Sequence, residues 1–185
     1  TVARLIQHQG NDLKALNYLV NLKLEDKDID IRYMRALIAA QLNDINLAES
    51  DLRKIINSDP DHVDALNALG YTLADANKNL IEAKKLIERA YQSEPSNAAI
   101  IDSMGWVLYR LGNFNEALLY LEKAYEMEPS EETTSHLVLT LWHMDQQQEA
   151  KDILNNAMVK SPNSEILKRT LTHINMQPET LTSER

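Results

Sequence analysis

Few residues of this 185-residue chain have the type and spacing that catalysis or metal binding requires. It contains no cysteine, which excludes disulfides and thiolate chemistry. His136 and His143 are seven residues apart. On a helix that spacing is about two turns, or roughly 10 Å, too far for a shared zinc ion. No H-E-x-x-H motif accompanies them, so we expect surface or groove histidines.

The carboxylates do not form a catalytic pattern either. They are spread evenly along the chain, as on solvated helix faces. The densest acidic run, residues 25–28, lacks the glycine and the spacing of a calcium loop and is predicted to be a solvated linker. There is no phosphate-binding glycine loop and no G-x-S-x-G motif. We therefore predict no catalytic residues, no metal, no cofactor and no enzymatic activity.

The amino-acid composition indicates which classes of molecule the chain is expected to bind. The formal net charge of −9 disfavours nucleic-acid backbones and anionic membranes. No run of apolar residues approaches the length of a transmembrane helix. A hydrophobic content of 44% suffices for a packed core, and the scarcity of glycine and proline suits an all-helical protein. Partners are therefore expected to be proteins or peptides.

Residues 98–129 carry the clearest structural pattern, that of two helices folded on each other. Gly112 and Asn113 interrupt the pattern as a helix end does, and Pro129 ends the second helix. Gly105 lies inside the first helix, where glycine costs about 1 kcal/mol relative to alanine, so we expect close approach of the partner helix there. The two apolar stripes are Ile101, Met104, Gly105 and Leu108, then Ala117, Leu121, Ala124 and Tyr125.

The same pattern recurs along the chain with a period near 34. Successive prolines after the second helices are 35, 34 and 33 residues apart, and so are the alanines that open those helices. Gly70 and Gly105 are also 35 residues apart. The recurring residues are Pro60, Pro95, Pro129 and Pro162, with Ala48, Ala83, Ala117 and Ala150.

This skeleton resembles the tetratricopeptide repeat, with Leu66-x-x-Leu69-Gly70-x-x-Leu73 and Ile101-x-x-Met104-Gly105-x-x-Leu108 as its clearest copies. The resemblance implies an all-α, right-handed superhelical solenoid of antiparallel helix pairs, with ten or eleven helices and a carboxyl-terminal capping helix. Arg32 and Arg35 depart from the family pattern, because they occupy positions that are normally apolar.

The predicted organisation follows the repeat period. It comprises a truncated partial repeat at 1–28, repeats at 29–62, 63–97 and 98–131, a degenerate repeat at 132–163, a capping helix at 164–176 and a flexible tail at 177–185.

The resemblance also implies where a partner would bind. In tetratricopeptide arrays the first helix of each repeat lines the concave surface, through residues three before and one and four after the small Gly or Ala. We expect Trp106, Tyr109 and Trp142 to be partly exposed there; the alternative is that a tryptophan fills space between repeats. The predicted binding residues are Tyr33, Leu37, Asn67, Tyr71, Asp102, Trp106, Tyr109, Ser135, Leu139 and Trp142.

The best-known peptide site of this family, a clamp for two carboxylates, needs lysine, arginine and asparagine on the concave helices. That basic set is missing here, so a chaperone co-factor role is not expected.

A closer resemblance covers residues 61–171. The runs 64–75 and 102–112, with His136-Leu137 and Leu141-Trp142, are similar to the carboxyl-terminal repeats of proteobacterial tetratricopeptide proteins. Many of those are outer-membrane lipoproteins facing the periplasm, and one is the adaptor that delivers cell-wall hydrolases to a carboxyl-terminal processing protease. The resemblance implies a scaffold of the cell envelope, and any signal peptide or lipid-attachment cysteine would lie upstream of Thr1.

The leading hypothesis is a non-catalytic scaffold or adaptor that binds a partner protein or peptide through the concave groove. One alternative is a structural segment of a larger protein that self-associates into a homo-oligomer. Another is a cytoplasmic regulator that uses the same groove.

Overall fold

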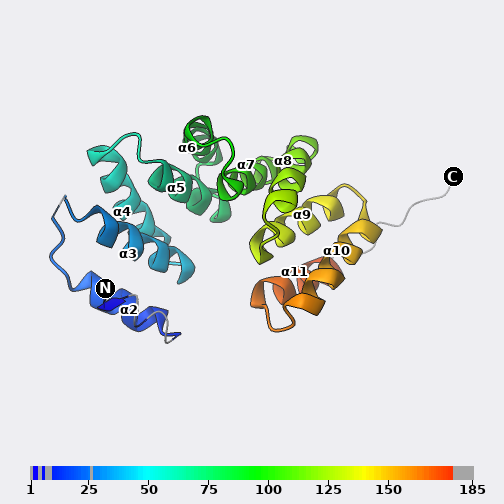
Figure 1. The fold of residues 1–185 in the computed structure, drawn as a ribbon, viewed down its shortest axis with the longest axis horizontal. Helices are drawn as coiled ribbons and strands as arrows, with labels where there is room; N and C mark the ends of the chain where they lie inside the picture. The colour runs from blue at the N-terminus through cyan, green and yellow to red at the C-terminus, as the bar shows by residue number, and fades with distance from the viewer. Residues whose placement is uncertain (1, 4–5, 7–9, 26, 177–185) are drawn as a thin grey trace.

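The computed structural model describes residues 2–3, 6, 10–25 and 27–176 (Figure 1). In this part of the chain the regular structure is helical throughout, without strands, which confirms the predicted all-α class. The helices are α2 (Asp12–Val20), α3 (Ile29–Gln41), α4 (Ile45–Ser58), α5 (Val63–Asp75), α6 (Leu80–Ser93), α7 (Ala98–Arg110), α8 (Phe114–Met127), α9 (Glu131–His143), α10 (Gln147–Lys160) and α11 (Glu165–Met176).

The apolar spacing of Leu16, Leu19 and Leu22 predicts a helix from Asp12 to Leu24, but α2 ends at Val20, where the backbone N–H of Asn21 bonds to the Leu19 carbonyl. The sequence also predicts a short helix at residues 2–9, most of which lies outside the described residues, as does the tail predicted at 177–185.

Consecutive helices form pairs that stack into an arch. Helices α3, α5, α7 and α9 each pack on the second helix of their own pair, and neighbouring first helices also contact one another. Helix α11 packs on α9 as the first helix of a further pair would. Figure 1 shows the arch, with α2 and α11 at its two ends and α5 and α7 near its middle. The first helices therefore make up the inner layer of a superhelical solenoid.

Short turns with left-handed residues join the two helices of each pair. Asn43, Asn77, Gly112 and Asp145 have φ values of 62°, 53°, 82° and 60°. Glycine, asparagine and aspartate tolerate this region best, which is why they occupy the turns. The turn that carries one additional residue has a second left-handed asparagine, Asn79, at φ 43°.

Small residues set the distance between the two helices of a pair. A Cβ atom at Gly105 would lie 2.5 Å from Leu121 Cγ and 3.2 Å from the Ala117 carbonyl oxygen on α8. At Gly70 it would lie 2.5 Å from Ile87 Cγ1 and 2.9 Å from the Ala83 carbonyl oxygen on α6. The predicted close approach is therefore present in both pairs.

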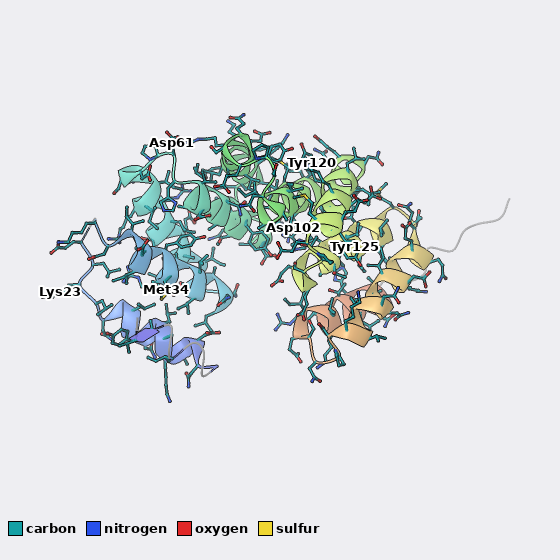
Figure 2. All side chains as sticks on the ribbon, viewed as in Figure 1. Lys23, Met34, Asp61, Asp102, Tyr120 and Tyr125 are labelled. Atoms are coloured by element: carbon teal, nitrogen blue, oxygen red, sulfur yellow. The ribbon has the colours of Figure 1, made fainter. Side chains whose placement is uncertain are left out.

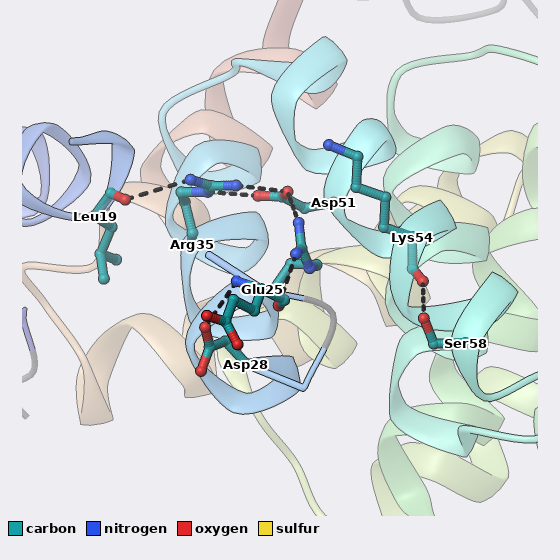
Figure 3. A network of polar contacts seen from close by, with 8 residues as sticks. Leu19, Glu25, Asp28, Arg35, Asp51, Lys54 and Ser58 are labelled. Carbon is teal, nitrogen blue, oxygen red and sulfur yellow. Dashed lines mark hydrogen bonds and ion pairs between the residues drawn. The ribbon is translucent and has the colours of Figure 1, made fainter. Parts of the chain in front are cut away.

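Arg32 and Arg35, the two departures from the repeat pattern, are buried and paired with Asp51. Figure 3 shows Arg35 between Leu19 and Asp51. Arg35 holds Asp51 of α4 with two hydrogen bonds, from Nε at 2.6 Å and from Nη2 at 2.8 Å. Arg32 Nη1 lies 3.4 Å from the same carboxylate. Two further hydrogen bonds reach backbone carbonyls: Arg35 Nη1 donates to Leu19 at 3.3 Å and Arg32 Nη2 donates to Glu25 at 3.1 Å. This ion network therefore joins α2, the following linker, α3 and α4.

Replacing Gly105 with leucine is expected to destabilise the protein by about 1–3 kcal/mol, because the side chain overpacks the α7–α8 contact. Urea denaturation of Gly105→Leu measures this. Lys85→Leu adds the same side chain at an exposed helical position and should change the free energy of unfolding by less than about 0.5 kcal/mol. Equal midpoints for the two variants would contradict the assigned packing.

Asp51→Ala is expected to cost about 3–5 kcal/mol, since it leaves two buried guanidinium groups without their counter-ion. The control is the triple variant Arg32→Met, Arg35→Met, Asp51→Leu, which removes all three charges and should be less destabilised than the single variant. Chemical denaturation measures the free energy of unfolding of both variants. A triple variant less stable than Asp51→Ala would show that the network itself stabilises this end of the arch.

Candidate functional site

A groove of about 800 Å³ lies on the inner side of the arch. Its walls come mainly from the first helices α3, α5, α7 and α9, with α11 at one end. In Figure 2, Asp102 lies at the inner edge of the arch, where α7 faces the opening. Because successive repeats place equivalent positions side by side, the groove runs across several repeats rather than within one.

Eight of the ten predicted residues line this groove. They occupy two register positions, three before and one after the small residue, in each of four helices. Four residues apart on a helix, these positions lie on one face. The eight are Tyr33, Leu37, Asn67, Tyr71, Asp102, Trp106, Ser135 and Leu139.

The other two predicted residues, Tyr109 and Trp142, do not line the groove. Tyr109 is directed to the turn after α7, where its ring packs against Phe114 and its hydroxyl lies 3.1 Å from His143 Nδ1. Lys151 Nζ of α10 lies 5.5 Å from the centre of the Trp142 ring. At the fourth position after the small residue, these side chains therefore contact turns and second helices.

The expectation that both tryptophans are partly exposed is wrong. Trp106 and Trp142 are each 6% exposed. The Trp106 ring stacks on His136 of α9, with centroids 4.1 Å apart and planes 16° apart, and also on Tyr109 at 4.9 Å. The indole fills the space between neighbouring first helices, which was the alternative interpretation. Tyr71 and Tyr109 are half-buried.

A buried polar pair lies beside Trp106 in the floor of the groove. His136 Nδ1 lies 3.0 and 3.1 Å from the two carboxylate oxygens of Asp102. A carboxylate can only accept, so the imidazole donates from Nδ1. The pair joins α7 to α9 and keeps the His136 ring against the indole.

Further residues line the groove besides the ten predicted to bind a partner. Ala68, Ser103 and His136, the last expected as a surface or groove histidine, stand two positions before the small residue in successive repeats, so the same register rule extended by one residue finds them. Asp75 and Glu132 come from the end of α5 and the start of α9, where no such rule applies.

The middle of the groove is electrostatically negative. Burial raises the pKa of the Tyr71 hydroxyl, and the carboxylates of Asp75, Asp102 and Glu132 raise it further. Toward α3, burial and then Asp64 raise the pKa of Tyr33 to about 12. Both phenols therefore stay protonated and act as neutral hydrogen-bonding groups at physiological pH.

Among the described residues, no cluster of three or more histidine and carboxylate side chains is arranged to hold a metal ion. None of the helices described combines the length and the apolar character needed to cross a membrane.

Comparison with known proteins identifies the family. Two models described as tetratricopeptide repeat match residues 33–99 and 98–131, which together make up more than half of the 185 residues. With the superhelical fold, this shows that the chain belongs to the tetratricopeptide-repeat family.

One curated relative is the TPR repeat-containing protein PA4667 of Pseudomonas aeruginosa, 43% identical over 116 residues. The match covers 63% of this chain, and the chain spans about a fifth of the length of that relative.

Solved structures show the same fold. TTC0263, a thermophilic tetratricopeptide protein of Thermus thermophilus, is similar with a TM-score of 0.79 and 20% identity, over 95% of this chain and 96% of that one. A tetratricopeptide protein of Parabacteroides merdae has a TM-score of 0.77 and 17% identity, over 94% and 68% of the two chains. At such identities the likeness concerns the fold alone.

Because Trp106 is buried, Trp106→Ala should destabilise the protein by about 3–5 kcal/mol. Tyr109→Ala should cost less, since the ring is half-buried and lies at the turn. Urea denaturation measures the free energies of unfolding of both variants. Trp106→Phe is the control, because it keeps an aromatic ring on His136. A Trp106→Ala variant as stable as the wild type would contradict the packing described here.

Proposed function

We propose that this chain is a non-catalytic scaffold that binds a segment of a partner protein in its concave groove. Proteins of this family are generally non-catalytic interaction modules. The observation that carries the proposal is a single groove of about 800 Å³ to which five successive inner helices contribute. Such a surface is long enough to contact an extended polypeptide segment.

The apolar part of the groove supports this proposal. Leu37 is 39% exposed, and Tyr33, Tyr71 and Leu139 are half-buried beside the polar lining. Aromatic and aliphatic side chains bordered by polar groups are typical of the residues that contribute most to binding. A bound segment would remove this apolar surface from water.

The proposal applies equally in the cell envelope, as the closer resemblance implies, and in the cytoplasm. Self-association is the competing interpretation. It requires a second copy of the chain rather than a foreign segment, so sedimentation velocity over a range of protein concentrations separates the two.

A matched pair of leucine variants tests the groove. Random peptides displayed on phage are selected on the immobilised chain, and the enriched peptides are synthesised with a fluorescein label. Leu37→Glu should weaken their binding at least about tenfold, because it places a charge on the apolar contact surface. Leu119→Glu makes the same change on α8, at a leucine that is 68% exposed and outside the groove, and should leave binding unchanged. Fluorescence polarisation measures both.

Circular dichroism verifies that both variants fold. Peptides that bind Leu37→Glu and the wild type equally well would show that the binding surface lies elsewhere on the chain.

A further inference from the structure

We propose that the middle of the groove binds a lysine or arginine side chain of the partner segment, between the carboxylates of Asp75, Asp102 and Glu132. This inference rests on the proposed function and specifies the chemistry of the segment that the groove takes.

The three carboxylates come from three successive inner helices and meet around one side chain. Asp75 lies one turn after Tyr71 on α5, Asp102 is on α7 and Glu132 begins α9. All line the groove, and all three act on the Tyr71 hydroxyl, raising its pKa after burial has done so. Asp75 and Glu132 are exposed, so they can reach a ligand, while Asp102 is buried in the floor.

The chain does not neutralise these carboxylates with its own cations. Among the described residues, neither Asp75 nor Glu132 takes part in an ion pair, and Asp102 pairs only with His136. Arg110 is nearby, but its Nη1 donates to the Asp75 backbone carbonyl at 3.1 Å and its guanidinium lies 5.3 Å from the centre of the Trp106 ring. Arg169 and His173 line the groove at its α11 end.

Two unpartnered polar atoms in the same part of the groove provide independent support. The Trp106 indole is 6% exposed, and no acceptor in the described residues takes its Nε1–H. Asn67 Oδ1, one turn before Tyr71, is buried and has no donor there. A buried polar group without a hydrogen-bond partner destabilises the protein, so both atoms favour a ligand that supplies one.

A basic peptide segment offers what these groups lack. A backbone carbonyl can accept from Trp106 Nε1–H, and a backbone N–H or a side-chain ammonium can donate to Asn67 Oδ1. The cationic end of the side chain then meets the carboxylates, beside the Tyr71 ring. Charge-assisted hydrogen bonds of this type are the strongest that a protein surface forms.

The test uses the fluorescein-labelled peptides enriched in the phage selection, each paired with a version in which glutamine replaces every lysine and arginine. The enriched peptides should contain a basic residue at a common position. Its replacement should weaken binding to the wild type roughly ten- to a hundredfold.

The double variant Asp75→Asn, Glu132→Gln should bind the basic peptide more weakly, by a similar factor. It should bind the basic and the glutamine version of each peptide equally well. Its matched control is Glu122→Gln, Glu126→Gln, which removes the same charge from exposed positions of α8 outside the groove and should change binding less than about twofold. Circular dichroism verifies the fold of both, and the glutamine peptides test the inference on the unaltered chain.

The outcomes separate the two proposals. Peptides that lose binding to Leu37→Glu but bind equally well with lysine, arginine or glutamine would overturn this inference and leave the groove as the binding surface. Peptides insensitive to Leu37→Glu, or no enriched peptides, would overturn both. A loss of equal size in the α8 control would show that net charge alone attracts the peptide, which also overturns the assigned site.

Discussion

The whole structure depends on how closely the two helices of a pair can approach. At Gly70 and Gly105 the partner helix is so near that a Cβ atom would lie within 3 Å of its side chains. This contact sets the spacing inside a pair, and the repeated spacing produces the curvature that leaves the first helices on the inner side of the arch. The groove therefore depends on how each first helix packs on the second helix of its pair. The residues that line the groove and the residues of this contact alternate along the same first helices.

The amino-terminal end of the arch achieves the same arrangement with different chemistry. Where other repeats use apolar contacts, Arg32 and Arg35 enclose Asp51 and reach two backbone carbonyls. Buried charges require partners of opposite charge and hydrogen bonds, and here these partners come from α2, the linker and α4. The network therefore specifies how α3 sits against its neighbours, and through α3 it positions Tyr33 and Leu37 in the groove.

Along its length the groove changes in character. Leu37 and Tyr33 give the α3 end an apolar surface, the middle gathers carboxylates around Tyr71, and the α11 end carries Arg169 and His173. Trp106 of the inner layer packs within the chain, where it stacks on His136 and links two repeats. Its role is to support the groove floor, and only its unpartnered Nε1–H is left for an external acceptor.

What the sequence by itself determined is the part that depends on near neighbours in the chain. Glycine, asparagine and proline act through local backbone preferences. The period, the turn at Gly112, the helix end before Pro129 and the inner-face positions three before and one after the small residue therefore followed from the sequence. Tertiary structure decided what depends on residues about one repeat away. The burial of Trp106 requires His136, the pairing of Arg35 requires Asp51, and the negative middle of the groove requires three helices to converge on Tyr71. A periodic pattern reports which face a residue occupies, but not which side chain the next repeat places against it, because that depends on packing between repeats.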